Sequence, residues 1–571
     1  MEQKYIWNIE PRMTAQQYNA MSRFGGLLAK LLFVRGAKTE KEGMSILKDS
    51  GLKYDPFLMK NMDKTVSAIR KAIKKNKKIT IYGDYDADGV TASAILIKAI
   101  RTIGGDVDSY IPDRFAEGYG LNCDALKKIK ENGAGLVVSV DCGIRSVEEA
   151  EYARKINLPL IITDHHEPGE ILPEPKVLLS PKQPGDEYPD KNLAGCGIAL
   201  KIAQALTLKA EKGEKRIDME ELIMIATVGT VADLVPLKDE NRSLVKRGIE
   251  LFRLKNCRFV NAMSKKNDFD PRAMNGTLIS FTIAPRINAA GRISHASTAL
   301  NLILAENDEK ALEYASEIEK MNSERKLLTQ QIQESAEERI KEEGLPSVIC
   351  IKDEAFQMGV VGLAAAKLVE KYNRPAFVGS TDGNEIRISG RSVNGFDMIG
   401  SMDRIPDVFV KYGGHEKAAG ATVLEEKWDE FVKEINEIAN ENPGFLDMKP
   451  VLNAELLLPS DLITLKLFES VSLLEPYGEE NPVPLFEIDG LKVEGRFIVG
   501  QDKSHLKLTL SDCRGQIINA IAFGSAWRAD ELPKYIDVIC SIDKNSWNGN
   551  DSVQLQIKDM RTSMVKPSIK R

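Results

Sequence analysis

The sequence predicts an α/β protein built on a doubly wound, mostly parallel sheet with helices on both faces. Short apolar, β-branched runs alternate with helical stretches from Lys78 onward, which is typical of this class. Acidic clusters directly follow several of these runs. Of the 571 residues, 43% are hydrophobic and 28% are charged, which is ordinary globular composition. At roughly 150 residues per domain, the length suggests about four packing units.

The expected strands of this sheet can be placed from their composition. A β-branched run at 79–83 ends in Gly83 and is followed by helical periodicity at 92–104. Further strands are predicted at 107–112, 136–143, 158–166 and 176–180. Ligands of such sheets bind at the carboxyl ends of the strands, so the residues directly after each run are the candidates for chemistry.

A long amphipathic helix is predicted from Asp308 to Gly344. Apolar residues recur there three, four or seven positions apart among Glu, Lys and Gln, which gives one apolar stripe. The helix could pack on a single domain or connect two domains. We favour the connector, because a second α/β unit begins near Pro346 and runs to about Asn442.

From about Pro450 the chain predicts a small β-barrel. Short segments alternate apolar and polar residues and are separated by Gly, Asn and Asp, which is typical of strands joined by turns. An OB-fold is one candidate. An SH3-like barrel would leave nearly the same pattern, so the sequence keeps both open.

Charge and cysteine content limit the function classes. The 78 Lys and Arg against 84 Asp and Glu give a net charge of -6, which argues against a general basic coat for duplex DNA but leaves room for a local groove. The seven cysteines are scattered without zinc or redox spacing, and no run of about 18 apolar residues occurs, as a membrane span would need. We expect a reduced, cytoplasmic, soluble chain with no membrane association.

Carboxylates and imidazoles follow the predicted strands in a pattern that indicates a metal site. A lone Asp after a strand is usually a turn former or a helix cap. Six carboxylates at one sheet edge would repel each other strongly, and divalent cations relieve that repulsion. Oxygen-rich ligation with one or two imidazoles suits Mn²⁺ or Mg²⁺, and two such ions are the usual arrangement for attack on phosphorus. The residues are Asp84, Asp86, Asp88, Asp141, Asp164, His165, His166 and Asp233.

Seven motifs, taken in order, identify the chain as similar to a known family. GDYDADGVT (83–91), VDCG (140–143), TDHH (163–166) and VADLVPL (231–237) resemble the motifs of the DHH phosphoesterase superfamily. RINAAGRISHA (286–296), SGRSVNGFD (389–397) and GGHEKAAG (413–420) resemble those of its RecJ branch, the single-strand-specific 5′→3′ exonucleases. The resemblance covers nearly the whole chain and implies a DHH-type sheet, a second α/β unit called DHHA1 and an OB-like barrel.

Domain boundaries follow from the resemblance and the pattern together. We expect an N-terminal extension at 1–70, the DHH catalytic domain at 71–300 and the connector helix at 301–344. The DHHA1 substrate-binding domain is expected at 345–445 and the OB-like nucleic-acid-binding domain at 446–571.

The resemblance also implies roles for the strand-end residues. It implies two ions, Mn²⁺ or Mg²⁺, with Asp141 as the bridge between them. Asp84 is a further ligand or an acceptor behind the ligands. His166 would face the scissile phosphate or donate to a ligand, and Asp164 would orient the His165 ring, as metal-bound imidazoles usually require. The implied ligands are Asp86, Asp88, Asp141, His165 and Asp233.

Substrate-binding residues are implied in three regions. Ser389 and Arg391 resemble the residues that hold the 5′-terminal phosphate, and Arg114 and Arg286 would supplement them, because the planar guanidinium engages phosphate bidentately. His415 would belong to a substrate-binding lid.

In the predicted barrel, alternation along one strand would put Lys503, His505 and Lys507 on one face. Phe497 and Trp527 could stack on bases or be buried in the barrel.

The sequence departs from the superfamily pattern at two positions. Some branches place a His four residues before the first metal-binding Asp, where this chain has Tyr82; this favours the RecJ branch. Members of that branch often carry a His before GVVG, where this chain has Gln357. Gln donates a hydrogen bond but carries no charge.

The resemblance implies a metal-dependent exonuclease that degrades single-stranded DNA 5′→3′ to 5′-mononucleotides by two-metal-ion hydrolysis, in DNA repair and recombination. It also implies a single-strand-binding protein and a helicase as partners. A phosphodiesterase for cyclic dinucleotides or very short oligonucleotides is the second hypothesis, and the barrel argues against it. A non-catalytic DNA- or partner-binding scaffold is the third, and the complete ligand set argues against that.

Overall fold

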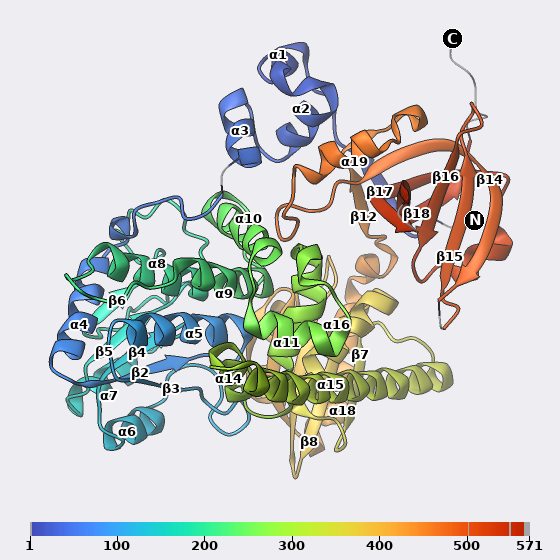
Figure 1. Cartoon of the computed structure of the whole chain (residues 1–571). Coiled ribbons are helices and arrows are strands. Elements are labelled where there is room, and N and C mark those ends of the chain that lie inside the picture. Colours follow the sequence, from blue (N-terminus) through green and yellow to red (C-terminus); the bar gives the residue numbers. More distant parts are fainter. Residues whose placement is uncertain (1–2, 49, 501, 548–549, 565–571) are drawn as a thin grey trace. The chain divides into compact units, whose positions relative to one another are not determined.

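The structure is a computed structural model that describes residues 3–48, 50–500, 502–547 and 550–564. Figure 1 shows the chain coloured along the sequence. It separates into two compact units that are interleaved in sequence. The barrel unit comprises Met1–Ser50, Pro236–Arg242 and Lys449–Arg571, and the α/β unit comprises Gly51–Val235 and Ser243–Met448. No described helix combines the length and apolar character that crossing a membrane requires.

A parallel sheet of order β3-β2-β4-β5-β6 forms the first half of the α/β unit, as the sequence predicts. Its central strands are almost entirely buried, which suits their Val- and Ile-rich composition. In register, Gly83 lies opposite Val140, and Val140 lies opposite Thr163. Three carboxyl ends therefore meet at one edge. The strands are β2 Lys78–Gly83, β3 Val107–Tyr110, β4 Ala134–Val140, β5 Leu160–Thr163 and β6 Val177–Leu179.

Helices cover both faces of this sheet. Leu126 and Ile129 of α6 and Ala150 and Ala153 of α7 share one core with the inward residues of the strands. α5 packs on α8 and α9 and also contacts β2, which explains why almost the whole of α5 is buried. The helices are α4 Met62–Lys74, α5 Ala87–Thr102, α6 Cys123–Glu131, α7 Val147–Lys155, α8 Gly195–Leu208 and α9 Met219–Ala232.

The long helix α15 Asp308–Glu343 confirms the predicted amphipathic helix. Its 36 residues span about 54 Å at 1.5 Å per residue. Asn307 caps its start by accepting a hydrogen bond from the Lys310 backbone N–H. It packs on α11, α13 and α14 and also on α16 of the following sheet. The helices before and after α15 in the chain are α10 Asp239–Leu254, α11 Arg258–Asn267, α12 Gly276–Leu278, the π-helical turn η4 Ile279–Ile283, α13 Ala284–Ile293, α14 Ser297–Leu304 and α16 Met358–Tyr372.

The second α/β region is a mixed sheet of order β10-β11-β9-β8-β7. Phe431 and Ile435 of α18 pack on one core of this region. Val360 and Ala364 of α16 share the other core with Ile332 of α15. The elements are β7 Ile349–Asp353, β8 Ala376–Asp382, β9 Glu385–Arg391, α17 Met398–Met402, β10 Phe409–His415, β11 Ala418–Leu424 and α18 Trp428–Glu441.

A closed barrel forms the centre of the barrel unit, as the sequence predicts. β14 pairs with β15 through its second half and with β17 through its first half, and bulges interrupt both registers. The remaining pairings, β15–β16, β16–β18 and β18–β17, complete the ring. The strands are β12 Val451–Ala454, β13 Leu456–Leu457, β14 Phe486–Val499, β15 His505–Ser511, β16 Ile517–Ala522, β17 Tyr535–Trp547 and β18 Asn550–Thr562.

The N-terminal segment shares its core with the barrel. β1 Ile6–Ile9 pairs in parallel with β12, and the Trp7 indole N–H donates to the Asp559 carboxylate at 2.9 Å. Buried Leu31 and Leu32 join Leu467 of α19 Leu465–Ser472 in the barrel core. The helices here are α1 Ala15–Asn19, α2 Gly25–Val34 and α3 Glu40–Lys48.

Candidate metal centre and substrate-binding residues

The carboxyl edge of the first sheet assembles the predicted metal-binding residues. Asp84, Asp141 and Asp164 directly follow the last residues of β2, β4 and β5, respectively, and these strand ends are in register. Asp141 has a positive φ of 62°, which bends the chain sharply away from the strand. The parallel sheet therefore brings together residues that are far apart in sequence, as predicted.

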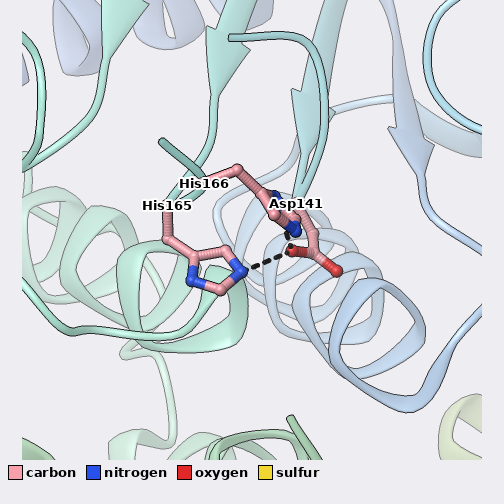
Figure 2. Close-up of side chains that lie close together, drawn as sticks. All are labelled: Asp141, His165 and His166. Carbon is pink, nitrogen blue, oxygen red and sulfur yellow. Dashed lines mark ion pairs between the residues drawn. The ribbon is translucent and has the colours of Figure 1, made fainter. Parts of the chain in front are cut away.

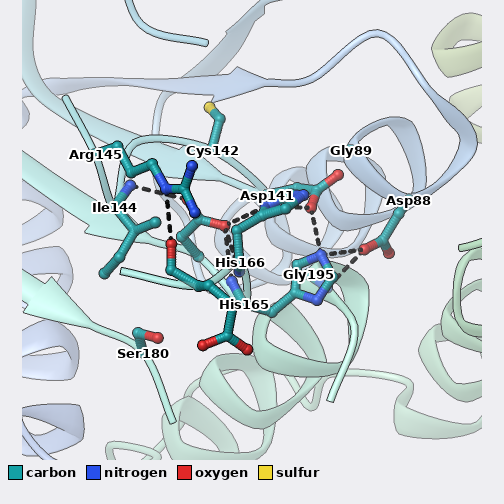
Figure 3. A network of polar contacts seen from close by, with 12 residues as sticks. Asp88, Gly89, Asp141, Cys142, Ile144, Arg145, His165, His166, Ser180 and Gly195 are labelled. Carbon is teal, nitrogen blue, oxygen red and sulfur yellow. Dashed lines mark hydrogen bonds and ion pairs between the residues drawn. The ribbon is translucent and has the colours of Figure 1, made fainter. Parts of the chain in front are cut away.

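Two helix beginnings complete the edge. Asp86 caps α5 by accepting hydrogen bonds from the backbone N–H groups of Asp88 and Gly89. The Asp88 carboxylate accepts from the backbone N–H groups of Gly195 at 2.6 Å and Cys196 at 2.9 Å, at the start of α8; Figure 3 shows Asp88 beside Gly195. A Cβ at Gly195 would lie 2.7 Å from Cβ of Asp141, so this close approach requires glycine.

His165 lies at the centre of the cluster. Its Nε2 atom is 3.1 Å from Oδ1 of Asp141, 3.5 Å from Oδ2 of Asp233 and 3.8 Å from Oδ2 of Asp88. Asp233 reaches this position from the carboxyl end of α9, where it is the capping residue. Figure 2 shows both histidine rings beside Asp141.

Three overlapping groups of the described residues each have ligand atoms within 4.8 Å of one another. One group is acidic, and the other two each include an imidazole. Asp141 belongs to both the acidic group and a group with His165, which suits the predicted bridging position. The groups are Asp84–Asp86–Asp141, Asp88–His165–Asp233 and Asp141–His165–His166.

The donor set fits a divalent cation. Oδ1 of Asp84, Oδ1 of Asp141 and Nε2 of His165 are buried without a hydrogen-bond partner in the described part of the chain. Buried polar atoms without partners are rare in proteins. Carboxylate oxygens with one imidazole are donors that suit Mn²⁺ or Mg²⁺.

Electrostatics leads to the same conclusion. Burial, followed by repulsion from Asp86, raises the pKa of Asp84 to about 8. Burial and repulsion from Asp88 raise the pKa of Asp233 to about 8, and burial raises the pKa of Asp141 well above its usual range. Burial lowers the pKa of His165, so its ring is neutral and free to ligate. A cation that replaces the protons would hold these carboxylates ionised.

Asp164 holds the second histidine of the motif. Its Oδ1 atom accepts a hydrogen bond from Nδ1 of His166 at 2.8 Å, and its Oδ2 atom accepts one from the Ile144 backbone N–H at 2.9 Å. The contact to His165 is only to the backbone N–H, at 2.8 Å. The carboxylate therefore orients the ring of His166 and not, as predicted, that of His165. Consecutive side chains in the extended chain after β5 point in different directions.

Tyr119 is a site residue that the sequence analysis did not single out. Its hydroxyl lies 3.4 Å from Nδ1 of His166 and donates to the Asp141 carbonyl at 3.4 Å. Gly118 and Gly120 on either side both have a positive φ. An aromatic residue between two such glycines, in a loop after a strand, is the signal that could have pointed to it.

The arginines near the site differ from the prediction at one position. Arg286 is paired with Glu319 at 2.6 Å and donates to the Thr282 carbonyl, with its side chain only 11% exposed. Arg292, one and two-thirds turns further along α13, lies near enough to Arg114, Arg391 and Asp86 for their charges to affect its pKa. Burial, with repulsion from Arg114 and other arginines, lowers the pKa of Arg292 to about 10.

The positive charges of Arg114 and of Arg391, which is on β9 of the second sheet, both act on Arg292. Arg114 stacks over the Tyr85 ring with 4.8 Å to the centroid, so Tyr85 is a further residue that the sequence analysis missed. Arg292 donates through Nη1 to the Gly359 carbonyl at the start of α16, at 3.3 Å. A Cβ at Gly359 would fall on the Arg292 carbonyl oxygen, so glycine is needed where α16 meets α13.

Ser389 and Arg391 lie together on β9. Arg391 donates to the Ser389 hydroxyl at 3.2 Å, and burial lowers its pKa. Across the sheet, Arg391 pairs with Ala418, and Ala418 pairs with His415. Because paired residues share a face, His415 lies on the side of Arg391, about 10 Å away across two strand spacings. His415 is exposed at the end of β10. Gln357 is the N-cap position of α16, and its side chain makes no capping hydrogen bond.

On the barrel, two of the three predicted basic residues share a strand. His505 and Lys507 alternate on β15, but Lys503 precedes the strand in a turn with a φ of 54°. Lys507 pairs with Phe497 of β14, which is 58% exposed. Trp527 is also exposed rather than buried in the barrel. Phe523, which the sequence analysis missed, contacts the His505 ring edge-on at 5.1 Å.

Comparison with known proteins gives matches along most of the chain. Three family models match: the DHH family N-terminal domain at residues 78–230, the DHHA1 domain at 345–441 and the RecJ OB domain at 454–559. The last match decides between the two barrel candidates in favour of the OB-fold.

Relatives and solved structures give the same result. RecJ of Bacillus subtilis is 37% identical over 94% of this chain and 68% of its own length. RecJ of Salmonella typhimurium is 32% identical over 94% of this chain and 95% of its own length. A crystal structure of RecJ from Thermus thermophilus in complex with Mn²⁺ matches with a TM-score of 0.83 and 27% identity, over 99% of this chain and 81% of that one. With the strand-end cluster, the second α/β sheet and the barrel all in the family's order, the chain belongs to the RecJ family of single-stranded-DNA-specific exonucleases.

Proposed function

We propose that the protein is a metal-dependent exonuclease that degrades single-stranded DNA 5′→3′ to 5′-mononucleotides. The observation that carries this proposal is the buried cluster around Asp141, with unpartnered ligand atoms, in the same unit as the arginines near Arg292. Such a pair of sites suits a phosphodiester whose scissile group needs cations and whose terminal phosphate needs guanidinium groups.

Two ions, Mn²⁺ or Mg²⁺, would be held by the carboxylates and His165. We assign Asp84 and Asp86 to one ion, Asp88, His165 and Asp233 to the other, and Asp141 to both, in agreement with the grouping of ligand atoms. When bound, the ions would lower the pKa of the attacking water and stabilise charge on the phosphoryl oxygens.

His166 would act on the substrate rather than on a cation. Burial alone would raise the pKa of Asp164, but hydrogen bonds from His166 and backbone N–H groups lower it overall. Asp164 is therefore ionised and can only accept, so Nδ1 of His166 carries the proton. The other ring nitrogen, Nε2, is the atom available to the scissile phosphate or the leaving oxygen.

Recognition of the 5′ end would give the direction of degradation. We propose that Arg114, Ser389 and Arg391 bind the 5′-terminal phosphate, and that Arg292 takes the role first expected of Arg286. Burial of Arg292 and Arg391 supports this, since a phosphate would compensate positive charge held away from water. His415 would approach from the same face of the second sheet.

The barrel would hold the rest of the strand. Phe497, His505, Lys507 and Phe523 combine exposed rings with positive charge around β15, and Lys503 precedes them in the turn. Bases that stack on such rings gain about 1–3 kcal/mol each without sequence preference.

Several wider assignments stay proposals. We propose the domain boundaries 1–70, 71–300, 301–344, 345–445 and 446–571, a cytoplasmic location, and a role in DNA repair and recombination. A single-strand-binding protein and a helicase are the proposed partners, because a single strand must be exposed before this enzyme can act.

The main test is a substrate panel with Mn²⁺. We expect rapid release of mononucleotides from 5′-labelled single-stranded DNA and little digestion of blunt duplex. Equal digestion of both would remove the proposal, and activity confined to dinucleotides would favour the short-oligonucleotide phosphodiesterase. Asp141→Ala should abolish hydrolysis and keep strand binding, whereas Asp124→Ala, an exposed carboxylate on α6, should change neither.

A further inference from the structure

The α/β unit contains a second concave, positively charged site. A cavity of about 560 Å³ lies between the end of α10, α11, the short helical turn η3 Pro271–Ala273 and the start of α15. We call it the α11 pocket. Its lining contains more basic than acidic residues, in contrast to the net charge of -6 of the whole chain. The charged lining residues are Arg253, Lys255, Arg258, Lys265, Arg272, Asp270 and Asp308.

Both acidic residues of the pocket are already engaged. Asp308 pairs with Arg258 at 3.2 Å, and Asp270 accepts a hydrogen bond from the Arg272 backbone N–H at 2.9 Å. Lys265 and Arg272 are exposed, and within the described residues neither side chain has an ion-pair or hydrogen-bond partner. Among the described residues, the pocket therefore presents at least two cations whose side chains have no ion-pair partner.

The uncharged part of the lining combines apolar residues with the polar residues Asn256, Asn261 and Ser264. Phe252, Ala262 and Ala311 are buried beneath the charged rim, and Leu254 is 78% exposed. Arg253 fixes one wall by donating through Nε to the Met274 carbonyl at 3.0 Å. An apolar floor below a basic rim suits a ligand with a flat apolar part and a phosphate, which is the chemistry of a nucleotide.

The pocket is separate from the metal centre. Lys255 pairs with Glu220 in the first turn of α9, whereas Asp233 caps the last turn of the same helix. The 14 residues of α9 correspond to about 20 Å of helix. None of the proposed metal ligands or 5′-phosphate residues lines the pocket.

We propose that the α11 pocket is a second nucleotide-binding site, which takes a nucleotide through its phosphate. Two sources share this chemistry: a free 5′-mononucleotide, and a nucleotide unit within a single strand. Lys265 and Arg272 bind the phosphate, and the base lies against the apolar floor. The site goes beyond the proposed function, because it needs neither the metal ions nor a 5′ end.

The test compares two double variants of the full chain in EDTA, so that hydrolysis plays no part. Lys265→Gln with Arg272→Gln removes the two free cations. Lys127→Gln with Arg216→Gln is the matched control, with one exposed cation on α6 and one before α9. Titration calorimetry measures binding of thymidine 5′-monophosphate, thymidine and a (dT)20 strand. Hydrolysis of a 5′-phosphorylated trinucleotide with Mn²⁺ checks that both variants keep the basal activity.

If the free mononucleotide is the ligand, the titration curves of the parent and of the control variant with the monophosphate should each require two binding sites. The pocket variant then loses one of them, with affinity reduced by about tenfold or more. Thymidine, which lacks the phosphate, should bind all three proteins equally weakly.

If a strand is the ligand, (dT)20 affinity falls instead, and the slope of its logarithm against log salt decreases by about 1.4 for two lost phosphate contacts. Unchanged binding of both ligands by the pocket variant would overturn the proposal, as would an equal loss in the control. Neither result depends on whether the protein degrades DNA.

Discussion

Nδ1 of His166 lies 2.8 Å from Oδ1 of Asp164, which is itself buried and held by the backbone N–H groups of Ile144 and His165. This pair fixes one imidazole of the motif, while the neighbouring ring of His165 turns toward Asp141 at 3.1 Å. The two histidines are adjacent in sequence but differ in their contacts. His165 faces the carboxylate of Asp141, and His166 donates its Nδ1 proton to the carboxylate of Asp164.

The first prediction follows from this division of roles. Asp164→Asn replaces an ionised acceptor by a neutral amide, so the His166 ring loses its charge support, and only one of the two oxygens that accept from Ile144 and His166 remains. We expect kcat on single-stranded DNA to fall by about 100-fold or more, while Mn²⁺ affinity changes little because the ligands remain. Metal titration measures the Mn²⁺ affinity, and single-turnover kinetics on the same preparation measure the rate of hydrolysis. A large loss of Mn²⁺ affinity with normal kcat at saturating metal would instead indicate that Asp164 supports His165, as the sequence analysis expected.

Metal affinity should depend steeply on pH. The pKa values of Asp84 and Asp233 are raised to about 8 by burial and by neighbouring carboxylates, so protons occupy these groups at neutral pH without cations. Binding must displace them, and affinity should fall roughly tenfold per pH unit for each displaced proton as the pH drops below 8. Calorimetry at pH 6.5 and 8.5 in buffers of different ionisation enthalpy measures the proton release directly. Equal Mn²⁺ affinity at the two pH values, with no proton release at either, would contradict the raised pKa values of Asp84 and Asp233.

Arg286 and Arg292 form a matched pair of substitutions within one motif. Arg292→Ala should raise KM for 5′-phosphorylated strands more than for 5′-hydroxyl strands, because its guanidinium lies among the proposed phosphate-binding groups. Arg286→Ala breaks a largely buried ion pair with Glu319 and should cost about 1–3 kcal/mol of stability, with KM unchanged. The measurements are initial rates on the two strands and thermal unfolding. The opposite pattern would restore the role that the sequence suggested for Arg286.

Much of the site was predictable because parallel strands end at a common edge. The strand boundaries alone were enough to predict that Asp84, Asp141 and His165 converge. The ring that Asp164 contacts was not predictable, since a one-residue difference in side-chain direction decides it. Arg286 and Arg292 lie on different faces of α13, six residues or about 600° apart, and the π-helical turn η4 before α13 obscures the phase of that helix.

In the barrel, too, the positions of residues in turns could not be predicted from the sequence. Alternation along β15 correctly places His505 and Lys507, but Lys503 lies in the turn before the strand, where φ is positive. The exposure of Phe497 depends on which side of the closed barrel that part of β14 faces, and Trp527 lies in the 3-10 turn Ala526–Glu531 rather than on a strand. Closure comes from bulges in β14, and the alternation of apolar and polar residues does not reveal them.

The final prediction concerns a carboxylate pair in the barrel unit. Burial, followed by repulsion from Asp489, raises the pKa of Glu487 to about 7, although Arg561 donates to it at 2.8 Å. The folded state therefore binds this proton more tightly than the unfolded state, whose Glu titrates near 4.5. Stability from this group is fully present below that value and is lost as the pH rises through about 7.

Thermal unfolding followed by tryptophan fluorescence tests this sign. In a Trp428→Phe background the remaining tryptophans, Trp7, Trp527 and Trp547, all belong to the barrel unit. We expect its Tm to fall between pH 5.5 and 8, and Glu487→Gln to flatten that dependence, because the amide stays neutral at every pH. Glu469→Gln, which changes an exposed carboxylate on α19, is the control and should keep the slope of the parent. A Tm that rises with pH in the parent would mean that Arg561, rather than burial, dominates the titration of Glu487.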